Sequence, residues 1–251
     1  MLASTRRREI LHRLIAEGYV EAKALSDELG VDASTIRRDL DSLARAGQAQ
    51  RTHGGARPVP GATAKLPYAM KGGDRLTEKA AIGAAAASRV GDGETVILDS
   101  GSTTYEVARA LRNHTGLTII TNDLRIAKYV AEMPDVRLLV TGGELLGSVF
   151  TLVGERAIAF LTDYTADWAF LGADAVDTAT GVTNMNTLEV PLKRTMIKVA
   201  KKALVVADSS KLGRRALAKV ADLDEIHGVI TDSGLDQATS RRFGDVLVHI
   251  D

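Results

Sequence analysis

The chain has 251 residues, of which 45% are hydrophobic and 25% are charged, a composition typical of a folded globular protein rather than a disordered one. Its length favours two domains over one. The 32 basic and 32 acidic residues balance, so net charge neither favours nor excludes a nucleic-acid partner.

The composition also excludes several kinds of site. With no cysteine, the chain has no disulfide, thiolate metal ligand or cysteine nucleophile. The five histidines are scattered without ligand spacing, so we expect no metal and no cofactor. Charged residues interrupt the N-terminal apolar pattern, and no apolar run approaches the roughly 20 residues that span a bilayer. We therefore expect a cytoplasmic protein with no membrane partner.

The first 45 residues have the pattern of three short helices. Ser4 or Thr5 can cap the first helix, and Gly18 ends it; its apolar stripe consists of Ile10, Leu11, Leu14 and Ile15. Residues 22–29 form a second helix that ends at Gly30. A third helix begins after Asp32, a good N-cap, and buries a stripe formed by Ile36, Leu40 and Leu43. The short connection predicts a helix-turn-helix.

The outer face of the third helix carries Ser34, Thr35, Arg37 and Arg38. Two guanidinium groups and two small hydroxyls suit phosphates and base edges, although a solvated surface bearing two arginines would have the same pattern. We expect Asp39 to pair with a basic residue rather than contact a base, because phosphates would repel it.

Residues 48–57 read as a short strand that turns at Gly54-Gly55. This pattern predicts a wing, with Arg51, His53 and Arg57 against the DNA backbone or minor groove. His53 could equally be a turn residue without a DNA contact.

Three motifs in this region resemble the winged helix-turn-helix of the DeoR/GlpR family of bacterial sugar-metabolism regulators. They are Arg8-Glu9-Ile10-Leu11, Ser34-Thr35-Ile36-Arg37-Arg38-Asp39-Leu40 and Arg51-Thr52-His53-Gly54-Gly55-Ala56.

Residues 58–73 are rich in proline and glycine, a composition that opposes regular structure. We therefore predict a DNA-binding domain at 1–57, a linker at 58–73 and a sensor domain at 74–251.

The sensor region alternates apolar strand patterns with helical ones, which predicts an α/β domain with a mostly parallel sheet covered on both faces. We expect helices at 75–90, 124–132 and 188–201. The expected strands are 95–98, 117–121, 136–140, 168–171, 203–207, 226–231 and 246–250.

Polar residues follow most of these strands, and ligands bind such sheets at the carboxyl ends of the strands. The candidate residues at these ends are Asp99, Ser100, Gly101, Ser102, Thr103, Thr104, Thr121, Asn122, Gly142, Gly143, Asp174, Asp208 and Lys211. Residues 99–104 open a helix, where free amides attract an anion such as phosphate. A single glycine pair or Asp-Ser pair is more often a turn or a cap, but five polar strand ends favour a binding site.

Glu189 and Lys193 are four residues apart and share a helical face. They could be a solvated surface ion pair. Alternatively, Lys193 reaches the anion and Glu189 a sugar hydroxyl.

The sensor region also resembles the DeoR/GlpR family over nearly its whole length. The matching pieces are Leu98-Asp99-Ser100-Gly101-Ser102-Thr103-Thr104, Thr121-Asn122-Asp123-Leu124, Thr141-Gly142-Gly143, Phe170-Leu171-Gly172-Ala173-Asp174, Glu189 with Lys193, and Asp208-Ser209-Ser210-Lys211. The resemblance implies a ribose-5-phosphate isomerase or CoA-transferase fold that senses a phosphorylated sugar or related metabolite.

We therefore expect a transcription regulator, most simply a repressor of a carbohydrate-metabolism operon, with operator DNA and a small-molecule effector as partners. A single winged head has a small interface, so we expect a homodimer or homotetramer. The competing hypothesis is a sugar-phosphate isomerase or CoA-transferase-like enzyme with a DNA-binding extension, because the strand ends carry carboxylates and amines suited to proton transfer. Fold-level analogy is a poor guide to chemistry, so we expect no enzyme.

Overall fold

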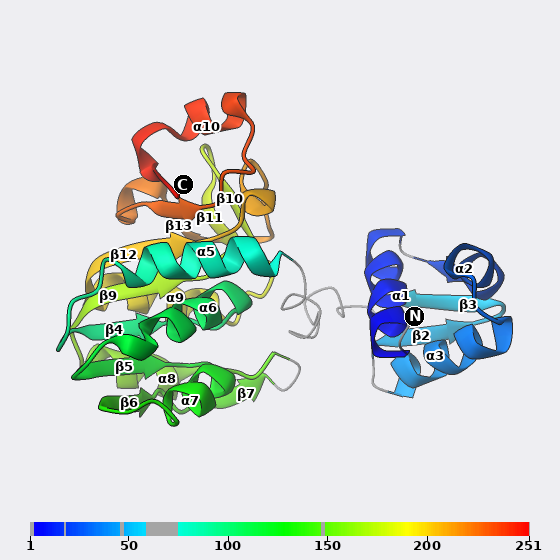
Figure 1. The fold of residues 1–251 in the computed structure, drawn as a ribbon, viewed down its shortest axis with the longest axis horizontal. Coiled ribbons are helices and arrows are strands. Elements are labelled where there is room, and N and C mark those ends of the chain that lie inside the picture. Colours follow the sequence, from blue (N-terminus) through cyan, green and yellow to red (C-terminus); the bar gives the residue numbers. More distant parts are fainter. Residues whose placement is uncertain (1–2, 18, 46–47, 59–74, 147–148, 251) are drawn as a thin grey trace. The chain divides into compact units, whose positions relative to one another are not determined.

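The computed structural model describes residues 3–17, 19–45, 48–58, 75–146 and 149–250. The chain divides into two compact units, Met1–Lys71 and Gly72–Asp251, and Figure 1 follows the chain through each of them. Pro58 ends a strand, and the rest of the predicted linker lies outside the described residues. No helix in the described ranges is long and apolar enough to cross a membrane.

The N-terminal unit contains three helices and a small antiparallel sheet in its described part. The helices are α1 (Ala3–Glu17), α2 (Ala22–Leu29) and α3 (Ala33–Arg45). The sheet has the order β1-β3-β2, formed by β1 (Val20–Glu21), β2 (Ala49–Thr52) and β3 (Gly55–Pro58). The predicted helix-turn-helix and wing are thus confirmed.

One hydrophobic core holds this unit together. Ile10 and Leu14 from α1 meet Ile36 and Leu40 from α3, and all four side chains are fully buried. Ala49 and Ala56 bring the wing strands into the same core. Gly30 ends α2 at φ 62°, a left-handed conformation that favours glycine.

The C-terminal unit is built on one large parallel sheet. Seven strands of the described residues form it in the order β15-β14-β12-β9-β4-β5-β6. Their bounds are β4 (Thr95–Leu98), β5 (Leu117–Thr121), β6 (Val136–Val140), β9 (Ala166–Leu171), β12 (Ala200–Val206), β14 (Val229–Thr231) and β15 (Leu247–His249). The predicted α/β architecture with a parallel sheet is confirmed.

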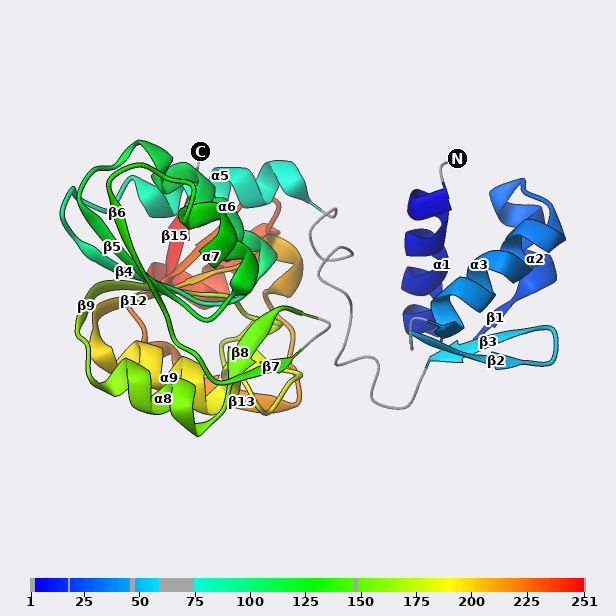
Figure 2. The same ribbon diagram turned by 90° about the horizontal axis from the view of Figure 1, so that it is seen from below.

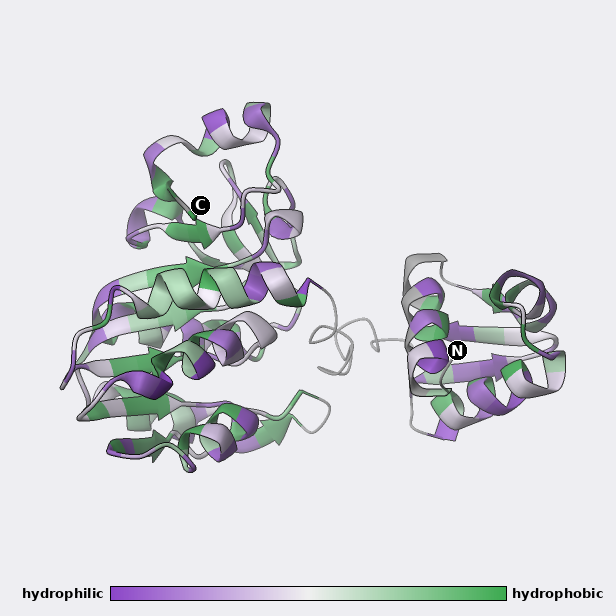
Figure 3. Cartoon of the chain, viewed as in Figure 1, coloured by the Kyte–Doolittle hydropathy of each residue, from purple (hydrophilic) through white to green (hydrophobic). Residues whose placement is uncertain are grey.

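Helices cover both faces of this sheet, as Figure 2 shows. On one face lie α5 (Leu76–Ala87), α6 (Ser102–Ala110) and α7 (Leu124–Val130), and on the other lie α8 (Glu155–Thr162) and α9 (Val190–Val199). Successive strand residues face opposite sides, so Val96 and Leu98 pack beneath the first group of helices and Ile97 beneath the second. Figure 3 shows the resulting hydrophobic strands β4 and β5.

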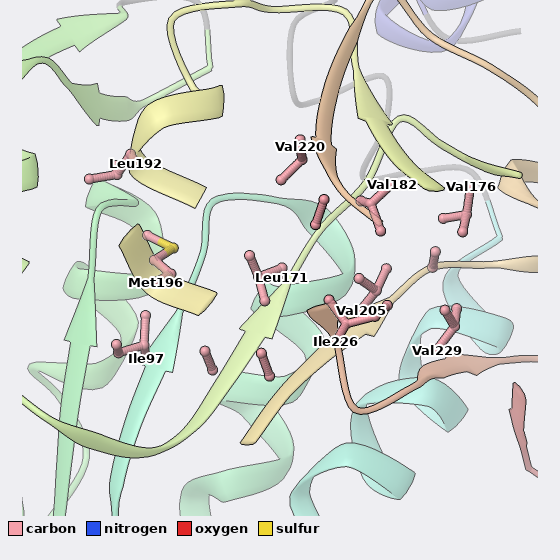
Figure 4. Packing of buried hydrophobic residues seen from close by; sticks show 14 of the residues in the cluster. Ile97, Leu171, Val176, Val182, Leu192, Met196, Val205, Val220, Ile226 and Val229 are labelled. Carbon is pink, nitrogen blue, oxygen red and sulfur yellow. The ribbon is translucent and has the colours of Figure 1, made fainter. Parts of the chain in front are cut away.

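The core on the α8 and α9 face is aliphatic. Figure 4 shows Ile97, Leu171 and Val205 of the sheet facing Leu192 and Met196 of α9. Each of these five side chains is buried.

Several short elements were not predicted from the sequence. An antiparallel sheet with the order β10-β11-β13 consists of β10 (Ala175–Asp177), β11 (Gly181–Asn184) and β13 (Ala218–Ala221). A hairpin joins β7 (Glu144–Leu146) to β8 (Thr151–Val153), and α10 (Gln237–Phe243) follows β14. The remaining short elements are 3₁₀ helices at Leu111–Asn113, Ser209–Lys211, Leu223–Glu225 and Gly244–Val246.

Several predicted boundaries differ from the structure. The helices expected at 75–90 and 124–132 end at Ala87 and Val130, and the strand expected at 226–231 begins at Val229. The largest consequence is at β12. The helix expected at 188–201 ends at Val199, and the chain enters β12 at Ala200. Lys202 pairs with Trp168 of the neighbouring strand, so sheet pairing overrides the helical preference of lysine.

Candidate functional site

The outer face of α3 is open to solvent. Ser34, Arg37 and Arg38 are exposed and Thr35 is half-buried, whereas the stripe containing Ile36 lies in the core. Within the described part of this unit, neither Arg37 nor Arg38 has a hydrogen bond or ion pair to another side chain. Both guanidinium groups are therefore available to a ligand.

Asp39 points the other way, into the N-terminal unit. It is 6% exposed, and its Oδ2 accepts a hydrogen bond of 2.5 Å from Nε of Arg6 in α1. Arg7 adds a hydrogen bond of 2.7 Å to Ser42 Oγ. The prediction that Asp39 has an ion-pair partner within the protein is confirmed, and these contacts fix α3 against α1.

The wing residues divide into two kinds. Arg51 is engaged inside the unit, because its Nε lies 2.8 Å from Asp41 Oδ1 and its Nη1 donates to the Gly55 carbonyl at 2.6 Å. His53 and Arg57 are exposed. A DNA role for Arg51 would use the outer edge of a guanidinium group that already braces the wing.

In the C-terminal unit, polar residues follow adjacent parallel strands at one edge of the sheet. Asp99 follows β4 and Asn122 follows β5, directly after the register pair Leu98 and Thr121. Asp208 follows β12, and Asp232 follows β14. Because the strands are parallel and adjacent, these residues form one row at the carboxyl edge, where α/β folds bind ligands.

Asp99 and Lys193 form a buried ion pair at the centre of this row. They are 1% and 2% exposed, and Lys193 Nζ donates both to Asp99 Oδ2 and to the Gly172 carbonyl, the latter at 2.9 Å. The Gly172 amide donates to the same Asp99 oxygen at 3.0 Å. The alternative of a solvated surface pair between Glu189 and Lys193 is therefore wrong, because Lys193 is buried.

Lys193 carries its positive charge despite this burial. Burial alone would lower the pKa of Lys193, but the negative charges of Asp99, Glu189 and Asp174 outweigh it, and the pKa is raised above the ordinary lysine value. The ammonium group is therefore a permanent part of the site at neutral pH.

Three buried side-chain oxygen atoms of the C-terminal unit receive no hydrogen bond from the described part of the chain. They are Oδ1 of Asp99, Asn122 and Asn184. The side-chain amide of Asn122 donates to the Leu152 carbonyl and that of Asn184 to Glu189, so a flip of either amide would place two acceptors together. Buried acceptors without donors are costly, and these three suit a ligand that supplies hydroxyl groups.

Glu189 organises the loop before α9. Its two carboxylate oxygens accept hydrogen bonds from Asn184 at 2.9 Å and Asn186 at 3.1 Å. Asp174 accepts a hydrogen bond from the Met185 amide at 2.9 Å. These two predicted effector residues therefore shape the loop, whatever else they contact.

Several other predicted residues have structural roles at the same edge. Thr121 Oγ1 donates to the Leu98 carbonyl at 2.7 Å, and Thr104 Oγ1 donates to the Gly101 carbonyl at 3.0 Å. Thr103 is buried, Ser100, Gly101 and Ser102 are half-buried at the start of α6, and Gly142 and Gly143 are exposed.

Asp232 and Arg75 lie beside the Asp208–Ser209 strand end and were not predicted from the sequence. Asp208 is buried and caps the 3₁₀ helix that carries Lys211, and its neighbour Ser209 bonds to Asp232 through both its amide and its hydroxyl. Arg75 donates to Ser209 Oγ at 2.9 Å. Only the position of Asp232 directly after a strand could have signalled its role.

Two family models match this chain. The sequence model of the DeoR-like helix-turn-helix domain matches residues 6–59, and that of the DeoR C-terminal sensor domain matches residues 74–233. A putative aga operon transcriptional repressor of Escherichia coli O157:H7 is 38% identical, covering 92% of this chain and 87% of its own length. The glycerol-3-phosphate regulon repressor of Escherichia coli K12 is 31% identical, with 93% and 92% covered.

A solved structure, ribose 5-phosphate isomerase A from Methanocaldococcus jannaschii, is also similar, with a TM-score of 0.40, 22% identity and 53% of each chain covered. The matched relatives are regulators, so the enzyme hypothesis is not retained. With a DNA-binding helix-turn-helix unit and a sensor unit for a small-molecule effector, the chain belongs to the DeoR family of transcriptional regulators.

Proposed function

We propose that this regulator is a repressor of a carbohydrate-metabolism operon, acting in the cytoplasm as a homo-oligomer and controlled by a phosphorylated sugar or related metabolite. The names of the relatives support this proposal: one is a putative aga operon repressor and another a glycerol-3-phosphate regulon repressor. The proposed domain boundaries remain 1–57, 58–73 and 74–251.

The observation that carries the effector proposal is the pair of unpartnered oxygens on Asp99 and Asn122. These atoms are buried and follow neighbouring strands. Sugar hydroxyls are donors that would satisfy them. The adjacent start of α6 offers backbone amides with Ser102 and Thr103 to a phosphate group. A ligand that combines hydroxyls with a phosphate matches both features.

Within this site we assign Lys193 a supporting role. Its ammonium group is paired with Asp99 and the Gly172 carbonyl, so it fixes the Asp99 carboxylate with Oδ1 left for the ligand. Glu189 holds Asn184, whose Oδ1 is a third acceptor. The remaining candidates of the sensor domain line the same strand ends.

For the DNA half, we propose that α3 enters the major groove with Ser34, Thr35, Arg37 and Arg38 toward the bases. His53, Arg57 and the outer edge of Arg51 would contact the phosphate backbone. One such head provides a small interface, so two or more copies on a repeated or palindromic operator are needed for adequate affinity.

The test measures both halves in one full-length protein. An operator is first selected from fragments of the source genome, and its Kd is then measured with and without ribose 5-phosphate, glycerol 3-phosphate or glucose 6-phosphate. Thermal melting without DNA reports direct binding, because a ligand specific for the folded state raises the Tm. Inorganic phosphate and unphosphorylated ribose are the control ligands.

Two variants separate DNA binding from effector binding. Arg37→Ala/Arg38→Ala should lose operator binding and keep the ligand-induced rise in Tm. Asn122→Ala should keep operator binding and lose that rise. If no phosphorylated sugar changes either the Tm or the operator Kd of the wild type, the effector proposal is wrong.

A further inference from the structure

Arg75 is the first described residue after the segment that joins the two units, and it directly precedes α5. Its backbone is left-handed, with φ 54° and ψ 45°, a conformation that costs energy for any residue with a Cβ atom. Its carbonyl nevertheless accepts the Lys79 amide at 3.0 Å and so begins the hydrogen bonding of α5. The side chain of Arg75 also makes contacts of its own.

The guanidinium group of Arg75 lies on the polar ends of two strands. Nη1 donates to Ser209 Oγ at 2.9 Å, Nε lies 3.8 Å from Asp208 Oδ1, and Nη1 lies 3.9 Å from Asp232 Oδ2. Both aspartates are buried, whereas the arginine side chain is 40% exposed. The two ionic contacts are longer than hydrogen bonds, so a better acceptor can compete for this guanidinium group.

The strand ends that contact Arg75 are extensively hydrogen-bonded. Asp232 accepts hydrogen bonds from the Ser209 amide at 2.7 Å, Ser209 Oγ at 2.8 Å and the Gly234 amide at 3.0 Å. A Cβ atom on Gly234 would lie only 2.7 Å from Asp232 Oδ2. The strand ends therefore have more hydrogen bonds to lose than the arginine has.

These strand ends are continuous with the proposed effector site. β12 pairs with β9 through Val205 and Leu171, and Gly172, which follows β9, bonds to both Asp99 and Lys193. The farther part of α5 is also tied to the site, because Gly83 packs directly on the backbone of Glu106 in α6. The start of α6 is where we place the phosphate.

We propose that Arg75 couples effector binding to the DNA-binding unit: a phosphorylated effector draws its guanidinium group from Asp208, Ser209 and Asp232, and this changes the conformation at the start of α5. The inference rests on the proposed function. The two states differ in their contacts to the effector, which is the condition for a ligand to shift a conformational equilibrium.

The test compares full-length wild type with Arg75→Gln, which keeps a donor for Ser209 but removes the charge. Arg89→Ala, an exposed arginine shortly after α5, is the matched control. Each protein is titrated with operator in the absence and presence of saturating ribose 5-phosphate, glycerol 3-phosphate or glucose 6-phosphate. Calorimetry without DNA gives the Kd of the sugar phosphate.

We expect the effector to change the operator Kd of the wild type and of Arg89→Ala by roughly 5- to 150-fold, the usual range of coupling. For Arg75→Gln we expect a change of less than about 2-fold, with the sugar phosphate still bound within about 10-fold of the wild-type Kd. Arg75→Lys, which keeps the charge, should recover part of the coupling. Trp168 fluorescence confirms that each variant is folded.

Hydrogen exchange supplies a readout that needs no effector. In the free protein, Arg75→Gln and Ser209→Ala should both speed amide exchange at Lys79, whose amide bonds to the Arg75 carbonyl, relative to Arg89→Ala. Unchanged exchange would show that the side chain does not hold the start of α5, which overturns the inference.

The operator titrations and the calorimetry distinguish a failure of this inference from a failure of the proposed function. If the wild type responds to a sugar phosphate and Arg75→Gln responds equally, the coupling inference is overturned while the proposed function stands. If Arg75→Gln no longer binds the sugar phosphate at all, Arg75 is simply a ligand-binding residue and the inference is also wrong. A wild type that responds to none of the probes overturns the proposed function and this inference together.

Discussion

Replacing Lys193 by methionine tests the physical basis of the sensor site. Methionine nearly fills the volume of the lysine stem but leaves the Asp99 carboxylate, which is 1% exposed, without its cation. Removing one partner of a buried ion pair costs about 3–5 kcal/mol, because the remaining charge stays desolvated. For a domain of this size, about 2–4 °C of Tm accompany each kcal/mol. The expected fall in Tm is therefore about 6–20 °C.

The assay is urea and thermal unfolding followed by Trp168, the chain's only tryptophan. It lies in β9 and stacks on Phe170 with a centroid distance of 5.9 Å, so its fluorescence reports on the sensor unit. The double variant Asp99→Asn/Lys193→Met removes both charges and should recover more than half of the loss. A loss below about 1 kcal/mol in Lys193→Met, or no recovery in the double variant, would refute the reasoning.

The pH dependence of this loss has a definite sign. The folded-state pKa of Lys193 is raised above its ordinary value of 10.5. The pair therefore contributes its full stability below the ordinary lysine pKa and loses it as the pH rises through the raised value. The stability difference between wild type and Lys193→Met should stay constant from about pH 6 to pH 9 and shrink only in strong alkali.

Three further predictions concern other parts of the chain. Arg37→Ala and Arg38→Ala should each weaken operator binding by about 1–3 kcal/mol if the guanidinium group reads a base, and a mobility-shift titration that shows no loss for either variant would mean that another face meets DNA. Asp39→Ala removes the buried carboxylate that pairs with Arg6 of α1 and should cost the N-terminal unit about 3–5 kcal/mol, seen as lost amide protection in α3; unchanged protection would contradict it. Gly181 and Gly213 have the same φ of 71° but different surroundings. A Cβ atom at Gly181 would lie 2.1 Å from the Ala221 carbonyl oxygen of β13, whereas a Cβ atom at Gly213 would lie 3.6 Å from the Thr239 side chain. Replacement of Gly213 by alanine should cost about 1–2 kcal/mol and of Gly181 clearly more, and equal losses on denaturation would contradict the steric argument.

The elements that the sequence predicts well are those whose signals are local. α3 follows from the spacing of Ile36, Leu40 and Leu43, and β4 and β5 from short apolar runs that the structure reproduces at both ends. The sheet β10-β11-β13 was missed because its strands are short and one of its pairings, Val182 with Ala221, joins distant parts of the chain.

Prediction of the effector site from the sequence has the same limit, because only its local signals are visible. The polar residues after each strand are visible in the sequence, and the rule for parallel sheets places Asp99 and Asn122 at one edge. The partner of Lys193 is not visible, because Asp99 lies 94 residues away and only the packed α9 brings the two together. Burial, which decides between a surface lysine and an internal cation, depends on that packing.

Gly83 has a practical consequence for building hybrid regulators. A Cβ atom at this position would lie 2.6 Å from the Glu106 carbonyl carbon, so α5 and α6 touch backbone to backbone at this point. A chimaera that joins this sensor to another DNA-binding head should therefore take its crossover upstream of residue 75. A splice within α5 would graft a foreign helix surface onto α6 and force the two apart.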